Sequence, residues 1–244
     1  MLLSPPQVPH PPEAPREPRP GLGTETQIWL VRHQRVDAST LAYGDEDVPL
    51  SAEGQRGTDA VERAVRSALR PARVVASPLI RARRMGEAIA RGTGAELVLD
   101  DRLKEMNRGD WQGLPRTEYA ARWRSESERY WSDPLRWSPP GGESEEALVA
   151  RTFPVLEELA RHPAESPVRV LAAHRQVIRS LVAAAIGIPP GQSHAMQLAP
   201  GHSVLIADTG DRWSLLRSNV SIPGAPHLTE PSSGPVQDVP TRRA

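Results

Sequence analysis

Two histidines directly follow short apolar runs, and this placement gives them a chemical interpretation. His33 follows the run Ile28 to Val31, and His174 follows Val170 to Ala173. If both runs are strands of a parallel sheet, the two imidazoles lie at its carboxyl edge, where ligands of such sheets bind. One histidine alone is usually structural or merely exposed. Two at equivalent positions favour a shared functional site.

Two arginines accompany these histidines and give the predicted site a positive charge. Arg32 immediately precedes His33, and Arg81 lies shortly after Ser77-Pro78, a pair typical of a helix start. In the first turn of that helix, backbone N–H groups and the helix dipole favour an anion. Guanidinium groups bind phosphate oxygens through paired, charge-assisted hydrogen bonds. The sequence therefore predicts a pocket for a compact dianion such as a phosphoryl group.

Metal and nucleotide chemistry lack their usual sequence signals. The chain has no cysteine and no His-Glu-x-x-His, and no carboxylates stand at ligand spacing from the histidines, so we expect no metal site. Neither G-x-x-x-x-G-K nor G-x-G-x-x-G occurs, which disfavours a kinase, an ATPase or a dinucleotide enzyme. The absence of cysteine also excludes disulfides and thiolate nucleophiles.

The charge balance gives no reason to expect a nucleic-acid or membrane partner. Lys plus Arg equals Asp plus Glu at 30 each, so there is no basic excess for an anionic polymer or surface. Residues 1 to 24 lack the apolar stretch of a signal peptide, and no run reaches the roughly 18 apolar residues of a membrane span. We expect a cytoplasmic protein.

Strands alternate with helices along the chain. The apolar runs predict strands at residues 27–31, 73–76, 96–99 and 168–173, and a hairpin at 203–207 and 213–217. The helical patterns predict helices at residues 52–69, from Ser77-Pro78 to about 91, within 116–137, from Ser144 onward and at 177–186. This alternation predicts an α/β fold with three layers, α/β/α, and a mainly parallel central sheet.

Proline marks the ends of the chain as different from its middle. Of 26 prolines, eight fall in residues 1–24 and five in residues 221–244. Such density is incompatible with helices or central strands. We therefore expect one domain over residues 25–220, between disordered tails at 1–24 and 221–244.

Several stretches resemble, in order and spacing, the motifs of the histidine phosphatase superfamily, also called the phosphoglycerate mutase-like family. They span residues 30–33, 47–54, 77–82, 103–113, 139–144 and 170–181, with Asn219 and Ser221 near the end. Each stretch alone is a weak signal, whereas their common order is a specific one. The resemblance covers about residues 27 to 220 and implies the phosphoglycerate mutase-like fold.

The resemblance also implies a role for each candidate residue. His33 would be the nucleophile that becomes phosphohistidine, and Glu105 would serve as general acid and then general base. Arg32, Arg81 and His174 would bind the phosphoryl oxygens. No cofactor is required, and the substrate would be a small phosphorylated metabolite.

The sequence departs from the family pattern beside both histidines. Gln34 stands where the family has glycine, and Arg35 follows it in place of an acid or amide. Arg175 replaces the glycine after the second histidine, and His202 lies where an asparagine is missing. We expect these four side chains at the pocket rim. An altered leaving-group pocket, reduced turnover and harmless variation all remain open.

The activity implied by the resemblance has alternatives. The segment between Gly113 and Pro139 is short, which favours a phosphatase over a mutase. The residues of the motifs are similar to those of small bacterial phosphomonoesterases such as alpha-ribazole and glucosyl-phosphoglycerate phosphatases. A phospho-ligand or protein-binding module without turnover is the alternative from another class. The oligomeric state stays open, a dimer included.

Five aromatic residues either line a leaving-group pocket or pack as core and lid: Trp111, Trp123, Tyr130, Trp131 and Trp137.

Overall fold

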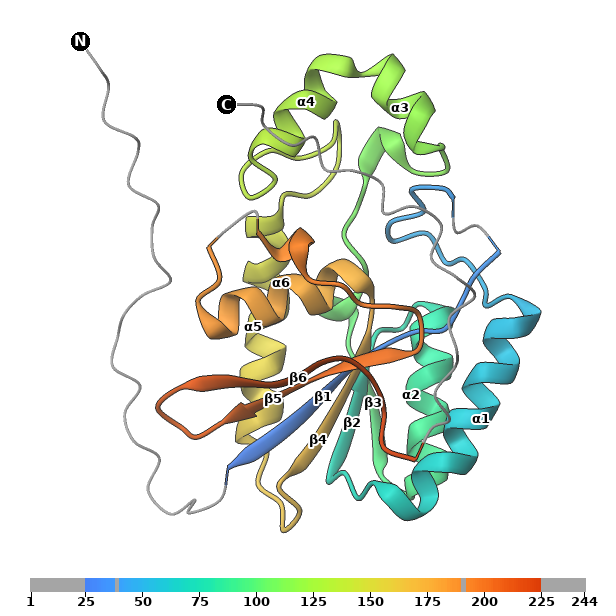
Figure 1. Cartoon of the computed structure of the whole chain (residues 1–244), viewed down its shortest axis with the longest axis vertical. Coiled ribbons are helices and arrows are strands. Elements are labelled where there is room, and N and C mark those ends of the chain that lie inside the picture. Colours follow the sequence, from blue (N-terminus) through green and yellow to red (C-terminus); the bar gives the residue numbers. More distant parts are fainter. Residues whose placement is uncertain (1–24, 38–39, 190–191, 225–244) are drawn as a thin grey trace.

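The computed structural model describes residues 25–37, 40–189 and 192–224 of the 244-residue chain. The predicted tail at residues 1–24, and residues 225–244 of the second predicted tail, lie outside the described residues. Figure 1 shows the arrangement of the elements.

A six-stranded sheet forms the centre of the fold. Its strands are β1 (Thr26–Arg32), β2 (Arg73–Ala76), β3 (Glu96–Leu99), β4 (Val168–Ala173), β5 (His202–Asp208) and β6 (Trp213–Ser221). They lie in the order β3-β2-β4-β1-β5-β6, in which β3, β2, β4 and β1 are parallel and β5 and β6 form an antiparallel hairpin at one side. The predicted mainly parallel sheet and its hairpin are confirmed.

Helices cover both faces of the sheet, which confirms the three-layer prediction (Figure 1). One face carries α1 (Ala52–Ala68) and α2 (Ile80–Thr93), and the other carries α5 (Glu145–Arg161) and α6 (Arg175–Ile186). Two short helices, α3 (Arg116–Arg122) and α4 (Arg124–Ser132), form the helical cover expected within residues 116–137. Among the described residues, no helix has the length and apolarity needed to cross a membrane.

The alternation of side chains along β1 explains the two-sided burial. Ile28 and Leu30 belong to the core cluster that includes α5 and α6, whereas Trp29 and Val31 belong to the cluster with α1 and α2. Successive side chains of a strand point to opposite faces. A strand covered on both faces is therefore apolar at every position, as this run is.

The start of α2 differs from the prediction. We expected Ser77 to cap the helix and Pro78 to occupy its first position, but the helix begins at Ile80. Ser77 stays at the strand end, where its hydroxyl is hydrogen-bonded to the imidazole of His174 at 2.8 Å. The carboxylate of Asp47 instead accepts the Ile80 N–H, at 2.5 Å. The start predicted at Ser144 is confirmed, since its hydroxyl accepts the Ala147 N–H at 3.2 Å.

The body extends past residue 220, where we placed its predicted end. Ile222 is only 1% exposed and belongs to the core cluster beneath α1 and α2. The residues that follow β6 therefore contribute apolar packing to this side of the sheet.

Candidate active site

The carboxyl ends of three neighbouring strands bring the site together. In the parallel register, Arg32 of β1 lies opposite Ala173 of β4, and Ala76 of β2 lies opposite Ala172. The backbone continues this pairing past the strands, because His33 donates its N–H to the Ala173 carbonyl at 3.2 Å. The imidazoles of His33 and His174 consequently lie with ring centroids 5.3 Å apart. The parallel register thus confirms the prediction that the strands preceding His33 and His174 end side by side.

His33 has one ring nitrogen fixed and the other free. Its Nδ1 lies 2.7 Å from the backbone carbonyl oxygen of Gln34. A carbonyl oxygen only accepts, so Nδ1 carries the proton and Nε2 keeps its lone pair. Burial, followed by the charges of Arg32 and Arg81, holds the pKa of His33 well below 6.5. The imidazole is therefore neutral at pH 7, the form that can act as a nucleophile.

Three buried nitrogen atoms around His33 make no hydrogen bond within the described part of the chain. They are Nε of Arg32, Nε of Arg81 and Nδ1 of His174. His174 is fully buried, and burial together with the Arg81 charge lowers its pKa well below 6.5. Buried polar groups in folded proteins almost always have a partner, so three such atoms in one place indicate a ligand site.

Residues 41–44 form a wall of the cavity that sequence reasoning missed. Arg81 holds this wall, because its two terminal nitrogens donate to the carbonyls of Glu46 at 2.6 Å and Gly44 at 2.7 Å. Its guanidinium carbon lies 4.8 Å from the ring centroid of Tyr43. Asp47 closes the arrangement by accepting the Ile80 N–H at the start of α2. That N–H, which we expected to help bind an anion, is therefore already occupied.

Glu105 lies at the amino end of α6, opposite the histidines. One carboxylate oxygen accepts the Met106 N–H at 2.9 Å, and the other accepts the Gln176 N–H at 3.2 Å. Arg151 fixes the backbone at this point by donating to the Glu105 carbonyl at 3.2 Å. Each carboxylate oxygen keeps further bonding capacity toward the cavity.

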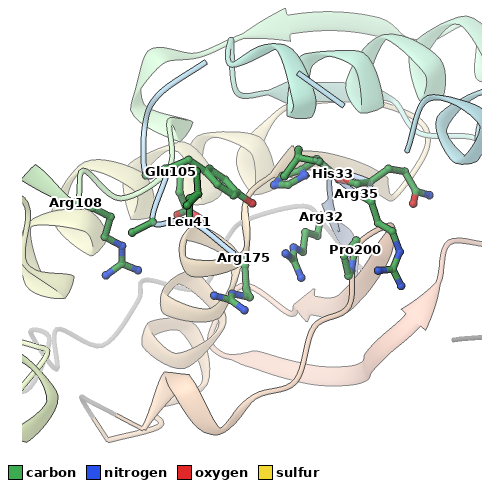
Figure 2. Close-up of a pocket in the computed structure, with 13 residues that line it drawn as sticks. Arg32, His33, Arg35, Leu41, Glu105, Arg108, Arg175 and Pro200 are labelled. Atoms are coloured by element: carbon green, nitrogen blue, oxygen red, sulfur yellow. Dashed lines mark hydrogen bonds between the residues drawn. The ribbon is translucent and has the colours of Figure 1, made fainter. Parts of the chain in front are cut away.

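An open cavity connects these groups (Figure 2). Its lining residues are Arg32, His33, Gln34, Arg35, Val36, Leu41, Ala42, Tyr43, Gly44, Glu105, Arg108, Arg175 and Pro200. Six of the nine predicted site residues are among them. Arg81 and His174 are fully buried and do not line the cavity, although they are close enough to His33 to lower its pKa.

His202 is the third predicted residue that does not line the cavity. It is half-buried at the start of β5, and its Nδ1 lies 3.3 Å from the Pro200 carbonyl oxygen. Arg108 was missed in turn, because the sequence of its loop gives no indication of the direction of its side chain. Its position three residues after Glu105 was the available signal.

Gln34 and Arg35 occupy the rim in different ways. The Gln34 side chain is buried beside two glycines: a Cβ atom at Gly57 would lie 2.8 Å from its Cδ, and one at Gly201 would lie 2.3 Å from its Nε2. Arg35 is exposed and pairs with Glu53 at 3.4 Å. The bulk of Gln34 is thus absorbed by packing, although part of it lines the cavity.

Of the five aromatic candidates, Trp111 and Tyr130 are buried in the core, whereas Trp131 and Trp137 are 40% and 46% exposed. Trp111 is 1% exposed and stacks on Tyr119 with centroids 4.5 Å apart, while Tyr130 meets its edge at 5.5 Å. None of the five candidates lines the cavity, whose aromatic wall is Tyr43. Within the described residues, no group of three or more histidine, aspartate or glutamate side chains is arranged to hold a metal ion.

Comparison with known proteins gives consistent relatives. The family model described as histidine phosphatase superfamily (branch 1) matches residues 28–221. A glucosyl-3-phosphoglycerate phosphatase of Mycolicibacterium vanbaalenii is 31% identical over 211 residues, covering 78% of this chain and 92% of the relative. A probable phosphoglycerate mutase, GpmB, of Salmonella paratyphi C is 29% identical over 177 residues, covering 70% and 80%.

The solved structures agree with the sequence relatives. A mycobacterial glucosyl-3-phosphoglycerate phosphatase in its native structure has a TM-score of 0.73 and 28% identity, covering 81% of this chain and all of that one. The same enzyme in complex with inorganic phosphate has a TM-score of 0.70 and 29% identity, covering 80% and 98%. This chain therefore shares its fold with that enzyme over nearly the whole length of the enzyme.

Proposed function

The chain belongs to the histidine phosphatase superfamily, and on this premise we propose that it is a phosphomonoesterase that hydrolyses a small phosphorylated metabolite through a phosphohistidine intermediate. Its relatives include phosphatases by name, one of them solved with inorganic phosphate. The proposal includes a cytoplasmic location, where a soluble metabolite would be met. It requires no metal and no organic cofactor.

The three unpartnered buried nitrogen atoms carry the proposal. Nε of Arg32, Nε of Arg81 and Nδ1 of His174 make no hydrogen bond within the described residues. All three side chains neighbour His33: the His174 ring centroid lies 5.3 Å from that of His33, and the charges of the two arginines lower the pKa of His33. A phosphoryl group has three equatorial oxygens whose negative charge must be stabilised in the transition state. Donors held in place before the substrate arrives stabilise that charge without reorganisation.

Ser77 supports a donor role for His174. The Ser77 hydroxyl oxygen accepts the Leu79 N–H at 3.3 Å and lies 2.8 Å from Nε2 of His174, to which we assign its proton. With Nε2 as acceptor, the neutral imidazole carries its proton on Nδ1. That proton is then available for a phosphoryl oxygen.

In the first step, Nε2 of His33 attacks phosphorus and the bond from phosphorus to the leaving oxygen breaks. Glu105, in its protonated form, gives a proton to that oxygen, so the product leaves as a neutral alcohol. The Nδ1–H of His33 keeps its hydrogen bond to the Gln34 carbonyl, which holds the ring in orientation as positive charge develops on it.

In the second step, Glu105 acts as a base. Its carboxylate takes a proton from a water molecule whose oxygen attacks phosphorus, and the nitrogen–phosphorus bond breaks. Inorganic phosphate leaves, His33 returns to its neutral form and Glu105 is protonated for the next cycle.

The test compares para-nitrophenyl phosphate hydrolysis by the wild type, His33→Gln and, as a matched control outside the cavity, His202→Gln. We expect His33→Gln to lose at least 1,000-fold in kcat, because removing a nucleophile eliminates the two-step path. We expect His202→Gln to stay within threefold. Alkali-stable phosphohistidine should be trapped in the wild type and not in His33→Gln.

Other results would reject the proposal in distinct ways. Equal rates in the wild type and His33→Gln would remove the covalent mechanism. Binding of inorganic phosphate without hydrolysis of any monoester would support a non-catalytic binding module instead. Isomerisation of phosphoglycerate without phosphate release would identify a mutase, the activity named for the Salmonella relative.

A further inference from the structure

The cavity holds more positive charge than one phosphoryl group needs. Four arginines line it, against a single carboxylate, that of Glu105. Arg32 belongs to the proposed phosphoryl site, and Arg35 is paired with Glu53 at 3.4 Å. Arg108 and Arg175 remain without an acidic partner in the described part of the chain.

Arg175 is placed between the phosphoryl site and the proton donor. It is the first residue of α6 and directly follows His174, and its next neighbour Gln176 donates the N–H that holds Glu105. The side chain is exposed in the cavity and makes no hydrogen bond or ion pair within the described residues. A leaving group must also lie beside Glu105, because Glu105 protonates its oxygen.

Arg108 is fixed on the other side of Glu105 by an uncharged partner. Its Nη1 donates to the Tyr130 hydroxyl at 2.7 Å, and its guanidinium carbon lies 5.7 Å from that ring centroid. Tyr130 is fully buried and packs edge-on against Trp111. The bond therefore orients the guanidinium, and the acidic group that acts on its charge is Glu105.

Arg179 adds a third cation one helical turn after Arg175, on the same face of α6. Its Nε is buried and makes no hydrogen bond within the described residues. Burial, then the neighbouring Arg175 charge, lowers its pKa to about 10.

The half-buried imidazole of His194 lies beside Tyr130, the hydrogen-bond partner of Arg108, with ring centroids 6.5 Å apart, and its Nε2 lies 3.9 Å from a carboxylate oxygen of Glu145. Burial, then the charges of Arg108, Arg179 and Arg175, lowers its pKa to about 4. One neutral ring thus lies within electrostatic range of all three guanidinium groups. Figure 2 shows Arg32, Arg175 and Arg108 in succession along the cavity.

We propose that Arg175 and Arg108, supported by Arg179, form a second anion subsite, so that the alcohol part of the substrate carries a carboxylate or a second phosphate. This inference rests on the proposed function, since it places the second group beside the phosphoryl site and next to Glu105. An anion in this position would add to the negative charge of Glu105, the one carboxylate that lines the cavity, and a planar guanidinium can bind it with two hydrogen bonds.

The first experiment measures substrate preference in matched pairs. The pairs are 3-phosphoglycerate with glycerol 3-phosphate, which differ by a carboxylate, and fructose 1,6-bisphosphate with fructose 6-phosphate, which differ by a phosphate. In the wild type we expect kcat/KM for the more anionic member of at least one pair to be tenfold higher or more. The pair that shows the preference identifies the second group.

Variants then assign the preference to the arginines. We expect Arg175→Gln and Arg108→Gln each to lower the ratio at least fivefold, mainly by raising KM for the anionic member, and Arg175→Lys to restore part of it. Arg35→Gln, which removes a paired arginine from the same cavity, should leave the ratio within twofold. Tyr130→Phe should lower the ratio because it releases Arg108.

Failure of this inference is distinguishable from failure of the proposed function. If the wild type hydrolyses both members of each pair equally, the subsite is rejected and the phosphatase stands. If no monoester is hydrolysed, calorimetry of His33→Gln with 3-phosphoglycerate and glycerol 3-phosphate still tests the subsite. Equal affinities would reject it, and tighter binding of 3-phosphoglycerate that Arg175→Gln abolishes would support it.

Discussion

Gln34 illustrates how a bulky residue is accommodated beside His33, the proposed nucleophile. It directly follows His33, and its side chain is 3% exposed because it occupies space that Gly57 of α1 and Gly201 leave open. Its own backbone carbonyl orients the His33 ring. The residue therefore serves the site through its backbone, while its side chain is a matter of packing.

This packing predicts energetic coupling between positions 34 and 57. In Gly57→Ala the new Cβ would lie 2.8 Å from Gln34 Cδ, so we expect a loss of about 1–3 kcal/mol, typical of overpacking. Gln34→Ala should remove most of that additional cost. Urea denaturation of both single variants and the double variant gives the coupling energy.

A matched control is Gly92→Ala, whose Cβ would meet the Glu62 carbonyl oxygen at 2.4 Å, away from Gln34. Its cost should be additive with Gln34→Ala. If the pair at 34 and 57 proves additive as well, the two side chains do not compete for the same space in solution.

At the scale of elements, α2 and the 43–47 segment hold each other in place. Arg81 of α2 donates to the carbonyls of Gly44 and Glu46, and Asp47 accepts the first N–H of α2 in return. This exchange positions both a wall of the cavity and one of the proposed phosphoryl ligands. A helix cap supplied by a distant loop thereby becomes part of the site.

Asp47→Ala should weaken both sides of this exchange. Loss of a capping bond costs about 1 kcal/mol of stability, and we also expect KM to rise severalfold because Tyr43 and Arg81 lose their fixed positions. Asp47→Asn keeps an acceptor oxygen and should restore most of both quantities. Denaturation and steady-state kinetics on the same preparations measure the two effects.

Ser144→Ala is the control, since it removes a comparable cap from α5, where Ser144 accepts the Ala147 N–H. It should lower stability by a similar amount without raising KM. If Asp47→Ala loses stability but keeps its KM, the segment does not depend on this cap.

Strands that local sequence identifies could be predicted, whereas helix starts that depend on distant residues could not. β2 and β4 were predicted to the residue, because short Val- and Ala-containing runs buried on both faces identify themselves locally. The starts of α2 and α6 were wrong by two residues or more. Their first N–H groups bond to Asp47 and Glu105, which lie 33 and 71 residues away in the sequence.

The site residues could be predicted only where the sheet places them. Residues that directly follow strands, such as His33 and His174, are placed by the sheet register and were found. Tyr43 and Arg108 reach the cavity from loops, where the direction of a side chain is set by contacts with Arg81 and Tyr130. No local periodicity encodes those contacts.

At the scale of the whole molecule, the concentration of arginine around the cavity affects stability as well as binding. Three histidines lie near these arginines: His33 and His174, which are buried, and the half-buried His194. For each, burial is the largest cause of a lowered pKa, and arginine charges add to it. The folded protein therefore keeps all three neutral under conditions in which an unfolded histidine would bind a proton.

This predicts that acid destabilises the fold well above the range where carboxylates titrate. Between the folded pKa of each histidine and about 6.5, the unfolded chain binds more protons, so the free energy of unfolding must fall as the pH falls. The expected slope is about 1.4 kcal/mol per pH unit for each histidine. His194 should contribute from pH 6.5 down to about 4.

Urea denaturation of the wild type and His194→Gln at several pH values between 7.5 and 4.5 isolates one of the three contributions. Above pH 6.5 the difference in unfolding free energy between the two proteins should be constant. Below it, the variant should lose stability less steeply, by about 1.4 kcal/mol per pH unit. Parallel curves for His194→Gln would mean that burial and the charges of Arg108, Arg179 and Arg175 together do not keep the imidazole neutral in the folded protein.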